Sequence, residues 1–524
     1  MWLVTPEQMK ELDRQTIQEA NIPGPTLMER AGTGVVNQLV KHYGSPKGKK
    51  AVVFCGKGNN GGDGLVIARL LQAKGAVLKV VMMAPYQDLS KDAKMMYRRF
   101  KKKAKPSQIL VLPNREKLES VTQNAHLIID ALLGTGLSSL IHEPYASAIE
   151  AINASEGYTV AVDLPSGLNS ETGAVLGTAV QANLTVTLGC PKIGLYVGEA
   201  IDRVGSIQMV DIGIPSEFIK KIRPPAQLLT PELIRPLIPK RRASSHKGTF
   251  GHAGIVAGSP GKAGAPALAA LGALRIGTGL VTVATPETVM PIVETKLLEV
   301  MTLALPETPD RLLGLEAASA LQDFCQNKSA LAFGPGIGVA PSTANLLWDL
   351  LPQLEIPCVL DADALNNIIS HLDVFSHMKQ PPVLTPHPGE MARLLAHTST
   401  KSINTDRIGI AKAFAMQHHV ILVLKGANTV IANPDGQIAV CPTGNPGMAS
   451  AGMGDVLTGM IAGFIAQGLT AWDAARAGVY LHGLAGDIAS LIQGEPGLIA
   501  SDLLSNIPQA FTNTLWGEKE TSPF

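Results

Sequence analysis

The hydrophobic positions along the chain form short apolar runs that are separated by longer segments with helical spacing. In the first half, apolar runs occupy residues 51–55, 77–82, 127–130 and 159–163, and each is followed by a turn rich in glycine, proline or polar residues. Short apolar runs bounded by such turns are typical of buried strands, whereas the segments between them predict helices. This alternation predicts an α/β fold built on a parallel sheet.

Two helices are expected before the first strand. Thr5, Pro6 and Gln8 supply a capping residue, a first-turn proline and a third-position glutamine, so a helix is expected to begin there. A second helix is expected over residues 26–42. After the first strand, the glycine-rich stretch 56–64 is predicted to be a loop that precedes the next helix.

The same alternation resumes in the second half, after a charged and proline-rich junction. Strand-like runs recur at residues 330–333, 358–361, 383–385 and 420–425, with helical segments between them. A chain of 524 residues is too long for a single core. We therefore predict two doubly wound α/β domains, residues 1–223 and 224–524.

The composition narrows the classes of partner. Hydrophobic residues make up 46% of the chain, charged residues 17%, and there are 52 glycines, which suits ordered α/β domains with many turns. A net charge of +1 argues against nucleic acid or an anionic membrane as a partner and favours small ligands. The five cysteines lie far apart, so neither a disulfide framework nor a zinc site is expected. Because no apolar stretch approaches the ~20 residues of a membrane span, we expect a cytoplasmic protein.

The glycine-rich stretch 56–64 is the first candidate for chemistry. Gly56, Gly58 and Gly61 match the dinucleotide-binding pattern, but the strand that follows lacks the acidic residue that would bind a ribose. The glycine pattern alone is therefore weak evidence for an ordinary dinucleotide-binding site. The stretch instead combines asparagines and an aspartate with bare backbone, which can hold a phosphate and a monovalent cation.

Polar residues at the ends of neighbouring strands form a second candidate. Asn60, Asp130, Asp163 and Ser166 each follow an apolar run, and the carboxyl ends of parallel strands face one crevice. We therefore expect these four side chains to converge on one site. Taken alone, Asp163 is more often a turn or cap residue.

The segments GNNGGDG, DALLGTGL and VDLPSGLN, with Cys190-Pro191-Lys192, resemble the NAD(P)H-hydrate epimerase family. The resemblance implies a Rossmann-like domain that inverts carbon 6 of hydrated NADH or NADPH and binds potassium. It implies potassium ligands at Asn60, Asp130 and Ser166. Because inversion at carbon 6 needs a proton transfer near that carbon, Asp163 is the candidate acid/base and Lys192 a candidate electrostatic helper. Inversion can proceed through loss and return of water or through ring opening, and the sequence does not choose between them. The implied contacts to the hydrate are Asn59, Asn60, Gly61, Gly62, Asp63, Gly134, Thr135, Gly136, Leu137, Ser138, Ser139, Leu140, Tyr145, Asp163 and Lys192.

In the second domain, residues 445–455 combine three glycines with small neighbours and end at Asp455, and a helix is expected from Val456. Such a stretch lets backbone amides approach an anion at the helix start. Asp455 is then either a catalytic base or a helix-capping aspartate. No P-loop pattern is present. His387 either faces a site or caps a turn, and Lys425 either contacts phosphate or extends along apolar surface to water.

The segments GTFGHAGIVAGS, GPGIG, LDADAL, LTPHPGE, KGANT and NPGMASAGMGDVLTG resemble the NAD(P)H-hydrate dehydratase family, whose fold is ribokinase-like. The resemblance implies that ADP, usually with Mg²⁺, phosphorylates the hydroxyl of the hydrate and that loss of phosphate restores NAD(P)H. Nothing in the residues excludes ATP. Asp455 would take the hydroxyl proton, and the amides around Gly452 and Gly454 would stabilise the phosphoryl group. The implied nucleotide contacts are Lys425, Gly426, Ala427, Asn428, Thr429 and Gly454, and the implied hydrate contacts are Ala253, Gly336, Gly338, His387 and Asp455.

In this order, the two domains resemble the bifunctional NAD(P)H-hydrate repair enzyme family. That resemblance implies the hydrates NADHX and NADPHX and an adenine nucleotide as ligands, and a homo-oligomer, a tetramer or higher. Two alternatives stay open. The second domain could be an ATP-dependent kinase of a vitamin precursor, such as a hydroxymethylpyrimidine or hydroxyethylthiazole, and the first could be a non-catalytic binding module.

Overall fold

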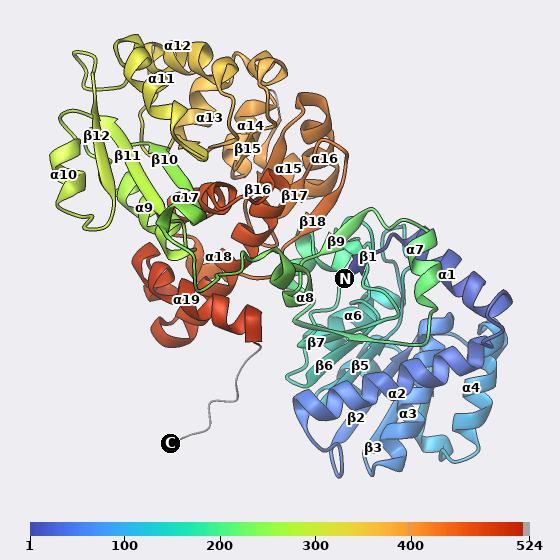
Figure 1. The fold of residues 1–524 in the computed structure, drawn as a ribbon. Helices are drawn as coiled ribbons and strands as arrows, with labels where there is room; N and C mark the ends of the chain where they lie inside the picture. The colour runs from blue at the N-terminus through green and yellow to red at the C-terminus, as the bar shows by residue number, and fades with distance from the viewer. Residues whose placement is uncertain (397, 517–524) are drawn as a thin grey trace. The chain divides into compact units, whose positions relative to one another are not determined.

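The computed structural model describes residues 1–396 and 398–516, and the chain divides into two compact units, Trp2–Ala226 and the part from Gln227 onward (Figure 1). The boundary expected after residue 223 lies close to this division. Within the described ranges, no helix combines the length and the apolar character that crossing a membrane would require.

The N-terminal unit is built on a seven-stranded sheet in the order β4-β3-β2-β5-β6-β7-β8. Every neighbouring pair is parallel, which confirms the predicted doubly wound sheet. The strands are β2 (Lys50–Cys55), β3 (Val77–Met82), β4 (Ile109–Val111), β5 (Leu127–Ala131), β6 (Tyr158–Val162), β7 (Leu184–Leu188) and β8 (Ser206–Val210).

Helices cover both faces of this sheet because the side chains of each strand alternate between them. In β2, Val53 and Cys55 pack with α2 (Gly24–Tyr43), α3 (Asn59–Ala73) and α4 (Lys91–Lys101). Val52 and Phe54 point the other way, toward α5 (Arg115–Thr122) and α6 (Tyr145–Asn153). Before the sheet, the predicted first helix is α1 (Pro6–Gln18), whose cap is the expected pair Thr5 and Gln8. It packs near α7 (Ser216–Lys221), and the short strand β1 (Trp2–Leu3) precedes it.

The prediction of a loop over residues 56–64 was wrong for most of that stretch. Helix α3 begins at Asn59, so all but the first three residues of the glycine-rich stretch are helical. Glycine normally weakens a helix, but here it allows close packing. A Cβ atom on Gly61 would lie 2.0 Å from the backbone oxygen of Gly56, and one on Gly64 would lie 2.7 Å from Cβ of Ala131.

The C-terminal unit contains a larger sheet in which β18-β17-β16-β15-β14-β13-β10-β11-β12 are neighbours in this order. The strands from β16 to β12 pair in parallel, whereas β17 and β18 form an antiparallel extension beside β16. These strands are β10 (His252–Val256), β11 (Leu280–Pro286), β12 (Met301–Leu305), β13 (Ala330–Phe333), β14 (Cys358–Leu360), β15 (Val383–Leu384), β16 (Ile421–Leu424), β17 (Val430–Ala432) and β18 (Ile438–Val440), and β9 (Ala226–Leu228) precedes them.

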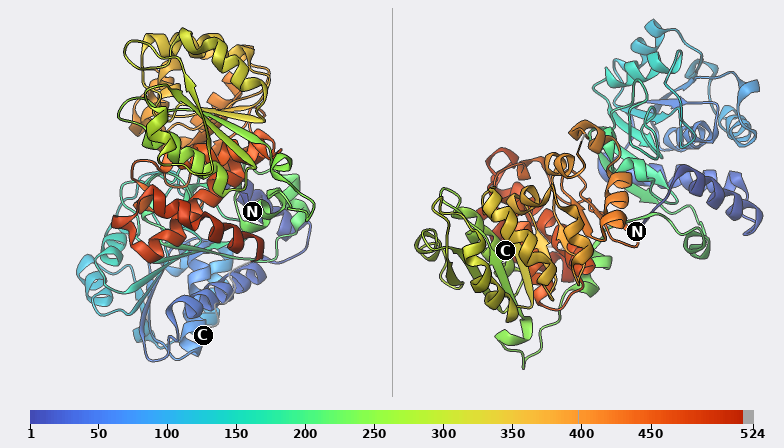
Figure 2. Two further views of the ribbon diagram at one scale, coloured as in Figure 1. Left: turned by 60° about the vertical axis from the view of Figure 1, so that its left-hand side comes forward. Right: turned by 90° about the horizontal axis from the view of Figure 1, so that it is seen from above.

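Two helical layers enclose this sheet, as Figure 2 shows. One layer consists of α9 (Gly264–Arg275), α17 (Met453–Ala466), α18 (Ala471–Gln493) and α19 (Ala500–Trp516), which share a core with alternate strand residues. The other contains α11 (Ala318–Gln326), α12 (Pro341–Leu350), α13 (Asp363–Ile368), α14 (Pro388–Leu394) and α16 (Arg407–His418). Shorter helices are α8 (Pro231–Ile234), α10 (Met290–Glu294) and α15 (Thr400–Thr405).

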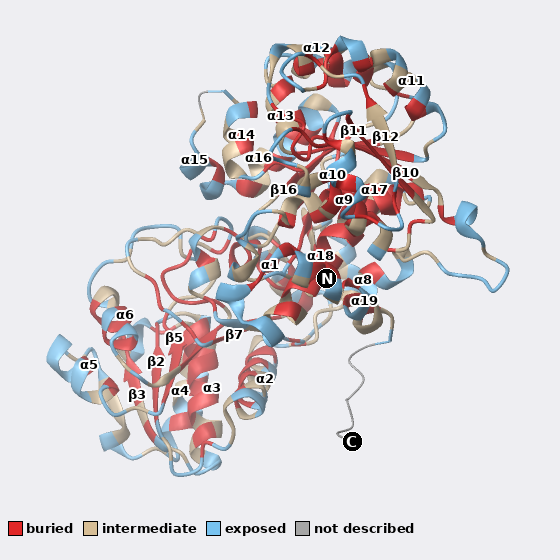
Figure 3. Ribbon diagram, turned by 90° about the vertical axis from the view of Figure 1, so that its left-hand side faces the viewer, coloured by how far each residue is buried: buried red, intermediate tan, exposed pale blue. Residues whose placement is uncertain are grey.

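Helix α17 is the most enclosed helix of this unit, and only its first turn contains residues that are not fully buried (Figure 3). Glycines let it approach α9 closely. A Cβ atom on Gly459 would lie 1.8 Å from the backbone oxygen of Ala269, and one on Gly272 would lie 2.5 Å from that of Val456. This contact fixes the position at which α17 begins.

We expect Gly459→Ala to destabilise the C-terminal unit by about 1–3 kcal/mol, because the added methyl group forces α17 away from α9. Denaturant unfolding of the full chain would measure the loss. Gly264→Ala is the matched control, since a Cβ atom there meets no atom within 4 Å. Equal unfolding midpoints for the two variants would contradict the close packing of α9 and α17.

Candidate active sites

The first site lies at the carboxyl ends of β2, β5 and β6, where the structure brings Asn60, Asp130 and Ser166 together as predicted. Ser166 donates from its hydroxyl to Asp130 Oδ1 at 2.6 Å and from its backbone N–H to Asp130 Oδ2 at 2.8 Å. Asn60 Nδ2 donates to the backbone oxygen of Leu133 at 2.8 Å, and the N–H of Leu133 donates to Ser166 Oγ at 2.9 Å. The three side chains are thus tied to one another through the turn after β5.

Asn60 Oδ1 is the unusual atom of this cluster, because it is buried and has no hydrogen-bond partner among the described residues. A buried polar atom without a partner is costly, and a bound cation would satisfy it. The neighbouring oxygens come from an amide, a hydroxyl, a carboxylate and a backbone carbonyl. Burial raises the pKa of Asp130 to about 6, against its hydrogen bonds from Ser166 and Leu132. This oxygen-rich set fits a monovalent cation.

Asp163 follows β6 and lies beside Lys192. Its backbone has a φ of +71°, a left-handed conformation that aspartate and asparagine adopt more readily than other side chains. Lys192 is fully buried, and its Nζ donates to Asp163 Oδ1 and to the backbone oxygen of Leu188. The N–H of Leu188 donates to the same Oδ1 at 3.1 Å. Every contact to the Asp163 carboxylate among the described residues uses Oδ1, so Oδ2 remains available.

A cavity of about 230 Å³ opens beside this carboxylate. Its apolar lining comes from Met9, Leu27, Met28 and Ile212, which would receive the flat face of a ring. The predicted contact residues that line it are Asn59, Asn60, Asp63, Gly134, Thr135, Asp163 and Lys192. The residues Gly61, Gly62, Gly136, Leu137, Ser138, Ser139, Leu140 and Tyr145 do not line it, and Leu140 is 60% exposed.

Two carboxyl groups of this cavity were missed by the sequence analysis, Asp13 of α1 and Asp92 of α4. Asp13 lies four residues after Met9, which places both on one face of the helix. This spacing places an acidic residue on the buried side of an amphipathic helix. That feature of the sequence could have identified Asp13 as a candidate site residue.

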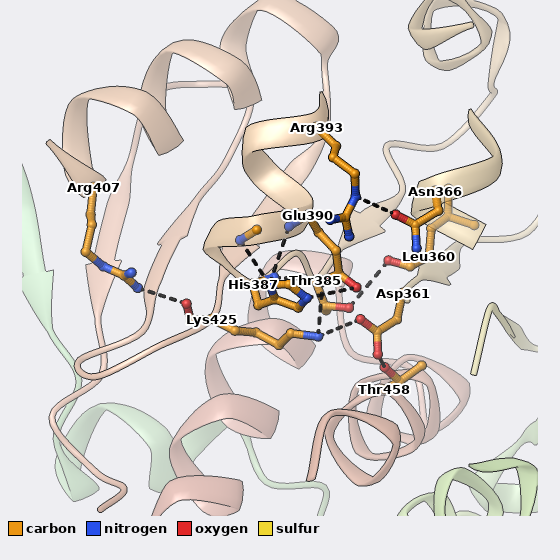
Figure 4. A network of polar contacts seen from close by, with 11 residues as sticks. Leu360, Asp361, Asn366, Thr385, His387, Glu390, Arg393, Arg407, Lys425 and Thr458 are labelled. Carbon is orange, nitrogen blue, oxygen red and sulfur yellow. Dashed lines mark hydrogen bonds and ion pairs between the residues drawn. The ribbon is translucent and has the colours of Figure 1, made fainter. Parts of the chain in front are cut away.

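The second site lies at the carboxyl ends of β14, β15 and β16, which carry Asp361, Thr385 and Lys425 (Figure 4). Lys425 Nζ lies 2.7 Å from Asp361 Oδ1 and 3.9 Å from Glu390 Oε2. Thr458 of α17 donates to Asp361 Oδ2 at 2.7 Å. Burial opposes the charge on Lys425, but Asp361 and Glu390 outweigh it, so its pKa is raised. Lys425 is therefore held in an ion pair and does not extend along apolar surface to water.

Asp455 lies in the first turn of α17. The expected helix start at Val456 was wrong, because α17 begins at Met453 with Gly452 as its N-cap, at a φ of +90°. Since Gly452 occupies the cap position, Asp455 is not the capping residue. Its carboxyl group makes no hydrogen bond with the described residues. Burial and the neighbouring Asp361 raise the pKa of Asp455 to about 7, although Lys425 acts in the opposite direction.

His387 is a helix cap, which is the second of the two roles considered for it. Its Nδ1 accepts from the N–H of Gly389 at 3.0 Å, and its own N–H donates to Glu390 Oε2 at 2.8 Å. The rest of the ring is half exposed, with Nε2 3.5 Å from Glu390 Oε1. The cap therefore fixes the ring beside Glu390 and Lys425 in the network of Figure 4 without burying it.

The other predicted residues of this domain lie in three places. Gly426, Ala427, Asn428 and Thr429 form the turn between β16 and β17, directly after Lys425, and a Cβ atom on Gly454 would lie 3.2 Å from Lys425 Nζ. Gly336 and Gly338 follow β13, where the N–H of Gly338 donates to Asp363 Oδ2 at 3.0 Å. Ala253 is fully buried near the amino end of β10, so the structure does not bring its side chain to the carboxyl edge.

Comparison with known proteins decides the family. A family model described as NAD(P)H-hydrate dehydratase matches residues 253–509, and a model described as YjeF-related protein N-terminus matches residues 24–194. A bifunctional NAD(P)H-hydrate repair enzyme from Moorella thermoacetica is 44% identical over 517 residues, which cover 98% of this chain and 97% of that protein. The chain belongs to the bifunctional NAD(P)H-hydrate repair enzyme family.

Another member of the repair enzyme family, from Salinibacter ruber, is 38% identical over 97% of this chain and 95% of its own length. A solved structure of the ADP/ATP-dependent NAD(P)H-hydrate dehydratase from Bacillus subtilis, co-crystallised with ATP and Mg²⁺, is similar to 55% of this chain and 98% of that chain, with 32% identity and a TM-score of 0.48. The largely parallel sheets of the two units, with helices on both faces, agree with the predicted doubly wound α/β fold class.

Proposed function

We propose that this protein repairs hydrated NADH and NADPH through two activities in one chain. Residues 1–223 interconvert the R and S hydrates at carbon 6, and residues 224–524 return the S hydrate to NAD(P)H at the expense of ADP, giving AMP and phosphate. The observation that carries the proposal is a candidate acid/base carboxyl group close to an enclosed lysine at the strand ends of each domain. Asp163 is ion-paired with the fully buried Lys192, and Asp455 lies close enough to Lys425, the ion-pair partner of Asp361, for their charges to interact.

In the first domain, the chain's own groups bind and orient the hydrate. Lys192 holds Asp163 Oδ1 from one side, which leaves Oδ2 to exchange a proton with the substrate hydroxyl. Asn60, Asp130 and Ser166 would hold potassium, which supplies a fixed positive charge next to the hydrate. The unpartnered Asn60 Oδ1 supports this assignment.

In the second domain, Asp455 would take the proton of the hydrate hydroxyl while that oxygen attacks the terminal phosphorus of ADP. The phosphoryl group leaves AMP and lies at the start of α17, where unpaired backbone N–H groups face it. The C–O bond then breaks, phosphate keeps the electron pair, and loss of a ring proton restores the double bond of NAD(P)H. A base with a pKa of about 7 suits this step near neutral pH.

Magnesium does not have a ready protein site here. Both oxygens of Asp361 already accept hydrogen bonds, from Lys425 and Thr458, and Glu390 Oε2 accepts from the N–H of His387. Within the described ranges, no group of three or more acidic, histidine or cysteine side chains is placed to hold a metal ion. Mg²⁺ would therefore bind as a complex with the phosphates of the nucleotide. Lys425 and the start of α17 would bind the remaining negative charge of these phosphates.

The proposed function is tested by incubating the full chain with a mixture of the R and S hydrates of NADH, K⁺, Mg²⁺ and ADP. We expect absorbance to report complete return of NADH. Without ADP no NADH should form, and without K⁺ only the S fraction should return while spontaneous epimerisation is slow. Nucleotide consumption with a vitamin precursor, and no return of NADH, would favour the kinase alternative instead.

The pH dependence of NADH formation should report on Asp455. Because the base must be deprotonated, the rate should rise with pH and reach half its plateau near pH 7. Asp361→Asn removes a carboxylate that raises the pKa of Asp455, so the rise should move to lower pH. A pH–rate profile for both proteins measures the shift, and a rise that stays in place would argue against Asp455 as the titrating group.

Two further properties stay predictions. The homo-oligomer rests on the family resemblance, and the cytoplasmic location rests on the lack of an apolar stretch long enough to span a membrane. Sedimentation of the purified chain would test the first of these.

A further inference from the structure

Helix α1 contributes a carboxyl group to the epimerase cavity that the proposed mechanism does not use. Asp13 lines this cavity together with Asp163, Lys192 and Asp63. It comes from an element before the sheet, whereas Asp163 follows β6. Asp13 and Asp163 are thus two of the four carboxyl groups that line the cavity, and they come from separate elements with different surroundings.

The surroundings of these carboxyl groups differ. Asp163 is paired with Lys192, but the carboxyl group of Asp13 makes no hydrogen bond with the described residues. Burial raises the pKa of Asp13 to about 6, with Lys192 lowering it and Asp163 raising it. Asp63 is buried more deeply, and burial followed by Asp163 and Asp13 raises its pKa well above the usual range. Asp92 is the remaining carboxyl group that lines the cavity.

We infer that Asp13 is a second catalytic residue of the epimerase, which protonates the hydroxyl group on carbon 6 so that it departs as water. This inference rests on the epimerase activity proposed for the first domain. Asp13 suits the role better than Asp63, because a group that is half-buried at the cavity can exchange its proton with solvent. A carboxyl group that titrates close to neutral pH can both give and regain a proton.

The step balances without any further reactant. The bond between carbon 6 and oxygen breaks with its electron pair on oxygen, Asp13 supplies the proton, and the lone pair of the adjacent ring nitrogen forms a cationic C=N bond. Water then adds to the other face of carbon 6, and Asp163 Oδ2 takes the proton that this water loses. The configuration at carbon 6 is then inverted, and exchange with solvent returns the proton from Asp163 to Asp13.

Charge favours this route over ring opening. After the first proton transfer, the cationic ring lies in a cavity that carries a single ammonium group, Lys192, and four carboxyl groups, Asp13, Asp63, Asp92 and Asp163. Opposite charges in a partly buried site stabilise one another more strongly than in water. Ring opening produces a neutral aldehyde, which gains nothing from this arrangement.

The test uses the full chain with K⁺ but without ADP, so that the purified S hydrate of NADH can only epimerise. Formation of the R hydrate is followed by chromatography in H₂¹⁸O across pH, for wild type, Asp13→Asn, Asp13→Glu and Glu7→Gln. Glu7 is an exposed carboxylate on the same helix, so Glu7→Gln is the matched control. NADH formation from the S hydrate and ADP checks the integrity of each variant.

We expect ¹⁸O in the R hydrate formed by wild type and a kcat that falls as pH rises through the pKa of Asp13. Asp13→Asn should lower kcat by about 100-fold or more with little change in KM, and Asp13→Glu should recover part of the rate with a displaced alkaline limb.

Inversion by wild type without ¹⁸O would indicate ring opening and overturn the inference, as would an Asp13→Asn variant with a nearly normal rate. If Asp13→Asn unfolds, an Asp13→Glu variant that folds yet does not recover the rate also overturns it. A wild-type protein that never forms the R hydrate would instead contradict the proposed epimerase function.

Discussion

Asp455→Asn is expected to lower ADP-driven formation of NADH by about 10²–10⁴-fold, while the R and S hydrates still interconvert at the wild-type rate. Asparagine keeps the size of the side chain in the first turn of α17 but cannot take the hydroxyl proton. The network of Asp361, Lys425 and Thr458 stays intact, because none of its hydrogen bonds involves Asp455. The loss should therefore appear in kcat, with nucleotide binding largely preserved.

Absorbance at saturating S hydrate and ADP measures this effect. Asp349→Asn is the control, because it makes the same change at an exposed position on α12 of the same unit. Epimerisation in the absence of ADP shows that the first domain still works. A rate for Asp455→Asn within a few-fold of the control would assign the proton transfer to another group.

Lys192→Met should produce the second large effect, because it leaves the Asp163 carboxylate half enclosed without its ammonium partner. Removing one member of a buried ion pair typically costs about 3–5 kcal/mol. We expect a loss of this order in the unfolding of the N-terminal unit, and an epimerase rate lowered by about 100-fold or more because the carboxylate is no longer oriented. Denaturant unfolding and chromatography of the two hydrates measure the two quantities.

The double variant Asp163→Asn with Lys192→Met separates stability from activity. Removing both charges should restore much of the stability that Lys192→Met loses, because no charge is left unpaired. It should not restore epimerisation, because the acid/base is gone. Recovery of activity without recovery of stability would contradict the role of Lys192 as the partner that orients Asp163.

The sequence was sufficient to predict the fold class and the strands that carry the two sites, because apolar runs and turns are local signals. The expected helix over residues 26–42 is α2 (Gly24–Tyr43), and the expected strand at 51–55 is β2 (Lys50–Cys55). The sites at the strand ends followed from the geometry of parallel sheets, which brings Asn60, Asp130 and Ser166 together.

The errors share one physical cause. Both helix starts in glycine-rich stretches were predicted too late, at α3 and α17, because local propensity treats glycine as a helix breaker. In both places, tertiary packing reverses that preference, since only glycine permits the approach to Gly56 in one case and to Ala269 in the other. Such contacts between distant segments cannot be read from neighbouring residues. Asp13 was missed for a related reason, since its cavity is formed by elements far apart in the chain.

The left-handed backbone at Asp163 limits how this position can change during evolution. Its φ of +71° suits aspartate, asparagine and glycine, and strains most other residues. Among these three, only aspartate has a carboxylate to pair with Lys192. Substitution at this position is thus limited by the backbone conformation and also by the need for a carboxylate. A lineage that no longer needed the reaction could keep the same turn with asparagine, but the buried charge of Lys192 would have to be removed as well. Two coupled substitutions would thus convert the enzyme domain into an inactive one that keeps its fold.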